Sequence, residues 1–203
     1  MKKFLFVALV GTLAAVIGSC ELFEDPFAGS LSVGDEGPAG GVVIFVDNDR
    51  DHDFDYIEVA PVDLGTGSTE YYWGLNVAVS GTGTGIGTGA TNTTRIISVQ
   101  EEETNTPTNY AAKAAEAFSY GGFENWHLPS KDELNLVHEL RASIDGLRPN
   151  QYYWTSSDVD SNVTWVWSQI VNSDTGRQAN AGSNGKTASR PVRVVRYFNE
   201  SDL

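Results

Sequence analysis

The spacing of apolar and polar positions divides the chain into an apolar leader, a first β-rich part, a helical middle and a second β-rich part. β-Branched and aromatic residues dominate two short runs, 42–46 and 56–60, and the polar turn between them predicts a β-hairpin. Further strands are predicted at 152–155, 164–170 and 190–198, between turns rich in Asn, Gly, Ser and Asp. Strand signals therefore lie on both sides of the middle of the chain.

Two segments in that middle part have the features of helices. Residues 109–118 are rich in alanine and precede two glycines, as expected for a helix that ends at glycine. Residues 130–133 form a capping box directly after Pro129, and apolar residues then recur at helical spacing to about Ala142. Because the strands and helices do not alternate as βαβ units, the sequence predicts an α+β fold with two helices and a mainly antiparallel, irregular sheet.

The first twenty residues have the layout of a bacterial lipoprotein signal. Lys2 and Lys3 precede an uncharged run, 4–17, which as a helix would span about 21 Å and fall short of the ~30 Å apolar core of a membrane. Residues 17–20, Ile-Gly-Ser-Cys, resemble a lipobox, which implies cleavage before Cys20 and lipid attachment to it. The alternative is an ordinary secretory signal that ends at a cysteine by chance.

Composition and charge narrow the class of protein. The chain has 203 residues, which after removal of a signal peptide (1–19) and a tether (20–33) leaves one domain, 34–198, and a short tail, 199–203. One cysteine cannot form an internal disulfide or a cysteine zinc cage. The net charge of −14 repels phosphate backbones and argues against nucleic-acid binding. The expected location is the cell envelope, with the lipid membrane as a partner through acylated Cys20.

Several segments of the chain form a recognisable set of motifs. The most specific is 126–136, WHLPSKDELNL, and the others are 33–41, 57–61, 73–74, 86–93, 153–157 and 190–193. Together they resemble the Lcl C-terminal domain family of bacterial surface proteins. The resemblance covers roughly residues 33–198. It implies a C-type-lectin-like α+β fold in which the first and last strands lie together, and it implies a fold more readily than an activity.

The Trp-x-Leu-Pro-x-x-x-Glu arrangement is also similar to that of formylglycine-generating enzymes, which share this broad fold. Those oxidases need a pair of cysteines that bind copper, and the single cysteine here is assigned to the lipid. The Glu-Pro-Asn and Trp-Asn-Asp signatures of calcium-dependent lectins are absent as well. Neither activity is therefore carried over from the resemblance.

An alternating series of carboxylates in the predicted hairpin imitates the ligand spacing of an EF-hand calcium loop. Its members are Asp47, Asp49, Asp51, Asp53, Asp55 and Glu58. His52 occupies the position at which that loop needs glycine, and strands rather than helices flank the series. The alternative is an exposed hairpin tip whose carboxylates are solvated. No cofactor other than this possible calcium ion is expected.

Aromatic and basic residues provide the candidates for ligand binding. Trp126 and Trp154 are predicted to be core residues, whereas Trp165 and Trp167 share one face of a strand and are either buried together or presented together to a ligand. Basic residues gather near the end of the chain, and the candidate ligand contacts there are Arg177 and Lys186. Their neighbours Arg190 and Arg193 are expected to pair with carboxylates inside the domain, such as Asp132 or Glu133.

Catalytic signals are weak in this sequence. The glycine-rich stretch 81–90 fits a loose dinucleotide pattern, but it is better explained as a loop that leads to a helix cap at Thr91 or Asn92. No Gly-x-Ser-x-Gly elbow, zincin helix or Walker loop is present. The sequence therefore predicts a non-enzymatic binding or adhesion module for glycans or surface proteins. The alternatives are a structural envelope lipoprotein without a soluble ligand and an unrecognised enzyme of the formylglycine-generating superfamily.

Overall fold

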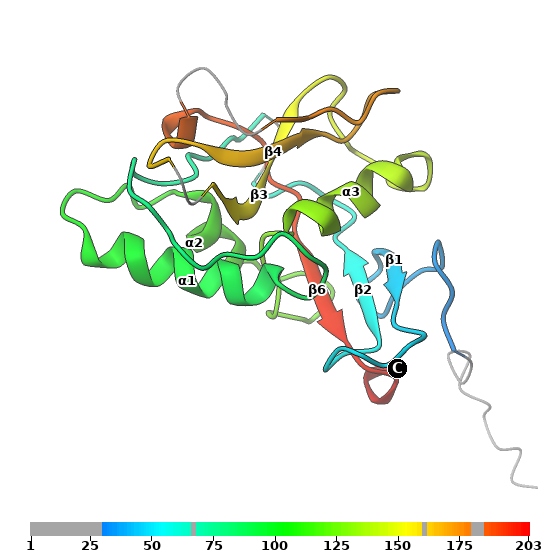
Figure 1. Cartoon of the computed structure of the whole chain (residues 1–203). Helices are drawn as coiled ribbons and strands as arrows, with labels where there is room; N and C mark the ends of the chain where they lie inside the picture. The colour runs from blue at the N-terminus through cyan, green and yellow to red at the C-terminus, as the bar shows by residue number, and fades with distance from the viewer. Residues whose placement is uncertain (1–29, 66–67, 160–161, 180–184) are drawn as a thin grey trace, which may run out of the picture.

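The computed structural model describes residues 30–65, 68–159, 162–179 and 185–203 (Figure 1). Within these ranges, three α-helices accompany two three-stranded sheets, ordered β1-β2-β6 and β3-β4-β5, and all strand pairs are antiparallel. The predicted α+β class is confirmed. Cys20 and the predicted signal peptide lie outside the described residues. None of the described helices is both long enough and apolar enough to cross a membrane.

The first sheet joins the predicted hairpin to the last strand of the chain. β1 (Val42–Val46) pairs with β2 (Tyr56–Val59), which confirms the hairpin, and β2 pairs with β6 (Val195–Phe198). β6 thus lies beside the second strand, and both ends of the described chain come to the same sheet (Figure 1). Its N-terminal neighbour Val194 continues this pairing, because its carbonyl accepts the N–H of Ala60.

The second sheet is built from β3 (Tyr152–Asp158), β4 (Val166–Ile170) and a two-residue strand, β5 (Gln178–Ala179). β3 and β4 correspond to predicted strands, and the short β5 was not predicted. The register between β3 and β4 shifts between Trp154 and Asp158, so this sheet is irregular, as expected.

The number of helices differs from the prediction of two. α2 (Ala111–Glu116) and α3 (Lys131–Glu139) correspond to the predicted segments, although both are shorter. The longest helix, α1 (Gly89–Glu102), was not predicted as an element and begins before the suggested caps at Thr91 and Asn92. The prediction of two helices is therefore wrong. α1 and α2 pack together on one side of the domain, while α3 contacts strands of both sheets (Figure 1).

The capping box at the start of α3 is present as predicted. The Ser130 hydroxyl accepts the backbone N–H of Glu133 at 3.2 Å, and the Glu133 carboxylate accepts the backbone N–H of Ser130 at 2.7 Å. Both bonds satisfy N–H groups that the helix itself leaves free. This arrangement fixes Glu133 beside the site described below.

The core contains the tryptophans that the sequence assigned to it. Trp73, Trp126 and Trp154 are buried, which confirms the prediction for Trp126 and Trp154. They belong to an apolar cluster that also holds the inner faces of α1 and α2. A second cluster surrounds Leu134 and Val137 of α3, between the two sheets. The α3 helix therefore joins both sheets through apolar contacts.

Three buried cations pair with carboxylates inside the domain. The ion pairs are Lys186–Asp158 at 2.8 Å, Arg193–Asp63 at 2.8 Å and Arg196–Glu58 at 2.9 Å. Arg193 is thus paired internally, as expected, but the predicted partners Asp132 and Glu133 are wrong. Arg190 likewise pairs with neither, and its guanidinium lies over the rings of Tyr152 and Trp154.

Both ends of the described chain pack at the same end of the domain. Leu31 and Leu203 contact a small buried cluster formed by Val43, Tyr56 and Phe198. Figure 1 places this end below the first sheet, whereas β4 lies at the opposite end. The first described residues and the last ones therefore lie on the side of the domain away from β4.

Candidate functional site

A cleft of about 380 Å³ opens between the β1–β2 loop and the first turn of α1. The loop contributes one wall, the start of α1 contributes the other, and β6 contributes an aromatic side chain. The lining residues are Asp51, His52, Asp53, Phe54, Gly87, Ala90, Thr91 and Tyr197. Its size falls within the ~300–1,000 Å³ that is usual for small-ligand sites.

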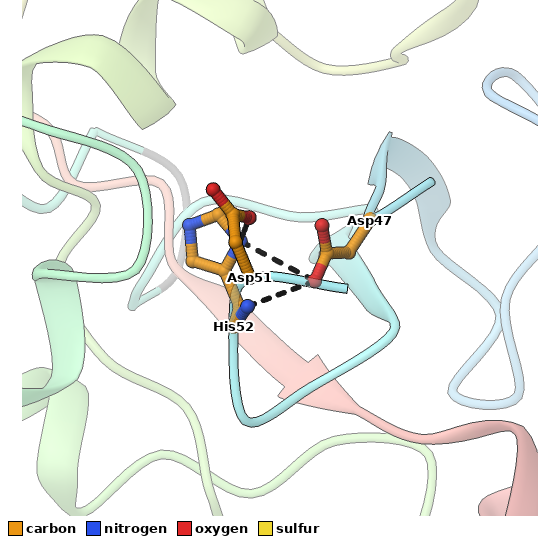
Figure 2. A group of neighbouring side chains, drawn as sticks. All are labelled: Asp47, Asp51 and His52. Atoms are coloured by element: carbon orange, nitrogen blue, oxygen red, sulfur yellow. Dashed lines mark hydrogen bonds and ion pairs between the residues drawn. The ribbon is translucent and has the colours of Figure 1, made fainter. Parts of the chain in front are cut away.

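The β1–β2 loop folds back on itself beside this cleft. The backbone N–H of Asp47 donates to the carbonyl of Asp55 at 2.8 Å, and the backbone N–H of His52 donates to the Asp47 carboxylate at 2.9 Å. Arg50 reverses the chain with a left-handed φ of 56°. The turn brings the side chains of Asp47, Asp51 and His52 to one place, as Figure 2 shows.

These three side chains form a compact cluster of possible ligand atoms. His52 Nδ1 lies 2.7 Å from Asp51 Oδ1 and 3.4 Å from Asp47 Oδ2. Burial opposes the ionisation of Asp47, but the hydrogen bond from the His52 backbone and the nearby His52 side chain outweigh it and lower the pKa of Asp47 below its ordinary value. Asp47 is therefore ionised at neutral pH although its side chain is only 3% exposed.

A row of aromatic rings connects the cleft to the interior. The ring centroids of His52 and Phe54 are 4.9 Å apart, and Phe54 stacks on Tyr197 at 4.2 Å. Tyr197 in turn makes an edge contact with His127 at 4.3 Å. These contacts hold the loop against β6, so the wall of the cleft is supported by packing as well as by hydrogen bonds.

Glu133 and Tyr197 fix the other wall of the cleft. Glu133 Oε1 accepts the Tyr197 hydroxyl at 2.6 Å and the backbone N–H of Gly87 at 2.8 Å, while the Tyr197 hydroxyl accepts the N–H of Gly89 at 2.9 Å. Burial raises the pKa of Glu133, and the hydrogen bonds that it accepts offset only part of this effect. The start of α1 is thus capped from within the protein, which explains how the glycine-rich loop becomes a helix.

His127 is the buried histidine next to this network. Burial lowers the pKa of His127 to about 4, so its imidazole is neutral at neutral pH. Its Nδ1 lies 3.4 Å from the Asn125 carbonyl, and its Nε2 has no hydrogen-bond partner among the described residues. Because the ring lies against Tyr197 behind the cleft, His127 supports the site from the interior.

The structure does not bring the six carboxylates of the predicted calcium loop together. Glu58 is fully buried, where its carboxylate accepts the N–H groups of Ala39 and Gly41 and pairs with Arg196. These partners neutralise the charge of Glu58, so it cannot serve as a calcium ligand. The predicted EF-hand arrangement is therefore wrong. Of the remaining five, Asp49 and Asp53 are exposed, Asp55 accepts the backbone N–H of Glu200, and Asp47 and Asp51 meet at His52.

The residues predicted to bind a ligand near the end of the chain have different environments. Trp165 is 40% exposed and Arg177 is exposed, whereas Trp167 is half-buried beneath the Lys131 ammonium group, 4.9 Å from its ring centroid. Lys186 is fully buried, pairs with Asp158 and lies over the Trp73 ring. The prediction that Lys186 contacts a ligand is therefore wrong, because its charge is neutralised inside the domain.

His52 is the member of the cluster that the sequence prediction did not use as a ligand. In the sequence, His52 only breaks the EF-hand pattern, because that loop needs glycine at this position. A histidine within a series of aspartates in a hairpin loop is the signal that identifies it, since imidazole and carboxylate together are common metal ligands.

Comparisons with known proteins do not assign this chain to a family. No protein-family model matches the chain, and no curated protein matches its sequence. The resemblance to the Lcl C-terminal domain therefore stays a prediction from the quoted segments.

Proposed function

We propose that this chain is an exported bacterial lipoprotein, anchored through acylated Cys20, whose α+β domain binds a glycan in the cleft beside α1. The observation that carries the proposal is the composition of that cleft. It combines the carboxylates of Asp51 and Asp53 with the hydroxyl of Thr91 and the aromatic residues Phe54 and Tyr197. Binding, rather than catalysis, is the proposed role.

These groups match the two kinds of surface that a sugar offers. Carboxylate and hydroxyl oxygens accept hydrogen bonds from sugar hydroxyls, and charged acceptors form the stronger bonds. Aromatic rings contact the apolar C–H faces of the sugar ring. Because Asp51 and Asp53 are both acidic, the cleft favours neutral or amino sugars over sulfated ones.

A filled cleft gives the direct test. Thr91 is exposed on α1 and lines the cleft, so Thr91→Trp places a large ring there. We expect the full chain, purified in detergent, to bind neutral or amino glycans on an array, and this variant to lose at least tenfold in affinity, roughly 1.4 kcal/mol. Ser98→Trp is the matched control, because Ser98 is exposed on the same helix outside this cleft.

The opposite end of the domain provides the competing location. Exposed Trp165 directly precedes β4, which lies at the opposite end of the domain from Leu31 and Leu203. If Trp165→Ala abolishes binding and Thr91→Trp leaves it intact, the ligand belongs to that surface and the cleft assignment is wrong. A chain that binds no glycan on the array would favour a protein ligand or a structural envelope role.

The anchor is tested separately from the ligand. Metabolic labelling with palmitate should mark the wild-type chain, and Cys20→Ala should remove the label and release the protein from membranes. Globomycin should block cleavage of the signal peptide. An unlabelled, freely secreted wild-type product would refute the lipoprotein assignment and leave the glycan proposal standing.

A further inference from the structure

We infer that Asp47, Asp51 and His52 form a binding site for a divalent transition-metal ion, of which Zn²⁺ is the best fit. This inference goes beyond the proposed glycan binding and does not depend on it. The site differs from the predicted calcium loop, because it uses two of the six carboxylates and adds an imidazole nitrogen.

The separations between the possible ligand atoms fit a shared metal ion. Ligands at about 2.0–2.2 Å from Zn²⁺ in tetrahedral or octahedral geometry lie roughly 2.8–3.5 Å from one another. His52 Nδ1 lies 2.7 Å from Asp51 Oδ1 and 3.4 Å from Asp47 Oδ2, and ligand atoms of all three residues lie within 4.8 Å of one another. A small shift of these side chains would place one ion between them.

The burial of His52 Nδ1 adds to this geometry. Its Nδ1 atom is buried and makes no hydrogen bond with good geometry among the described residues, although two carboxylates lie beside it. A nitrogen within ion-pair distance of two carboxylates brings three possible ligand atoms into a space that one metal ion can occupy. Figure 2 shows the side chains of Asp51 and His52 close together beside the Asp47 carboxylate, to its left in this view.

Asp47 adds an imbalance of charge that a cation would relieve. Its side chain is 3% exposed, and among the described residues no lysine or arginine forms an ion pair with it. The buried carboxylates of Glu58 and Asp158, in contrast, each pair with a buried cation. Since a buried charge is costly unless it is paired or bound to a metal, Zn²⁺ would supply the positive charge that no described lysine or arginine supplies to Asp47.

The ligand types favour a transition metal over calcium. Calcium takes six to eight oxygen ligands, whereas a site with one imidazole and two carboxylates matches Zn²⁺ with three protein ligands and an open position. Asp51 and His52 also line the cleft. The open coordination position would therefore face the cleft and hold water.

Titration of the metal-free full chain in detergent with Zn²⁺ tests this inference. We expect one Zn²⁺ per chain by calorimetry and by elemental analysis after dialysis, with little competition from equimolar Ca²⁺. Asp51→Asn and His52→Gln should each weaken binding by roughly 10–100-fold or more, because even the outer partners of metal ligands have effects of that size. Asp51 is 72% exposed, so its variant is expected to remain folded.

Asp49→Asn is the matched control. Asp49 is an exposed member of the same series of aspartates and lies outside the cluster, so this variant changes the charge without removing a ligand. Its Zn²⁺ affinity should stay within about twofold of the wild type, since exposed charges contribute little at ordinary salt. Absence of Zn²⁺ binding to the wild type, or equal losses in Asp49→Asn and Asp51→Asn, would overturn the inference. Zn²⁺ binding with no glycan binding would overturn only the proposed function.

Discussion

Carboxylates occur in two contrasting environments in this domain. In the interior, Glu58 and Asp158 each pair with a fully buried cation and also accept backbone N–H groups. At the β1–β2 loop, Asp47 and Asp51 meet only a histidine. In each interior pair one carboxylate faces one buried cation, whereas at the loop two carboxylates face one histidine side chain and, among the described residues, neither forms an ion pair with a lysine or arginine.

This difference separates structural groups from candidate functional ones. A buried ion pair that satisfies its own charges leaves nothing for a ligand, even when its residue types are those of a binding site. Lys186 illustrates the point, because the sequence places it in a basic segment and the structure encloses it. Carboxylates that lack a cationic side chain and lie next to a cleft are a better indication of a functional site. Among the described residues, the carboxylates of the loop cluster meet both conditions.

The largest effect is expected from breaking an interior pair. Lys186→Met leaves the Asp158 carboxylate buried without its cation, and we expect the free energy of unfolding to fall by about 3–5 kcal/mol in urea titrations. The double variant Lys186→Met with Asp158→Asn should lose less, because no unpaired charge remains. A loss below about 1 kcal/mol in the single variant would contradict the structural role of the pair.

An intermediate effect is expected from the buried histidine. His127 has a pKa of about 4 in the folded chain against an ordinary value of 6.5, so the unfolded chain binds more protons between these pH values. Stability from this group is therefore fully present above pH 6.5 and is lost as the pH falls toward 4, by on the order of 3 kcal/mol. Urea titrations at several pH values measure this loss.

His127→Phe supplies the control for that pH dependence. The variant keeps a ring against Tyr197 and cannot titrate, so the difference between its unfolding curve and that of the wild type isolates His127 from the carboxylates. If both proteins lose the same stability between pH 6.5 and 4, the histidine is already charged in the folded state and the interpretation is wrong.

The smallest effect is expected at the loop cluster when no metal is present. Asp51 is 72% exposed, and exposed ion pairs contribute little, so Asp51→Asn should change the free energy of unfolding by less than about 1 kcal/mol. Thermal unfolding in the presence of a chelator measures this change. If the free energy of unfolding fell by more than about 2 kcal/mol, the cluster would have a structural role like that of the interior ion pairs.

Local signals in the sequence were sufficient for the hairpin, α3 and the core tryptophans. The capping box at Ser130 and the β-branched run of β1 depend on neighbouring residues alone, so both are readable without the fold. Helix α1 was missed because its buried face contains few large apolar residues and includes Asn92 and Gln100, whose side chains bond to Ser156 of β3 and to Leu75. Its stability comes from tertiary contacts.

The candidate site was only partly predictable for a related reason. The series of aspartates was visible, but the choice of Asp47 and Asp51 over Asp49 depends on the turn at Arg50 and on the hydrogen bond from His52 to Asp47. The opposite wall of the cleft comes from α1 and β6, which are distant in sequence. The spacing of residues along the chain specifies neither which aspartates meet His52 nor which distant elements form the opposite wall of the cleft.

The adjacent packing of Leu31 and Leu203 has a practical consequence for work with living cells. If the chain is lipidated, a fluorescent reporter or epitope fused after Leu203 would be crowded between the domain and the bilayer, where antibodies have poor access. A reporter placed in a surface turn of the β3–β4–β5 layer would point outward instead. The same proximity suits grafting the whole unit into an exposed turn of a carrier protein, because its two junctions would start close together.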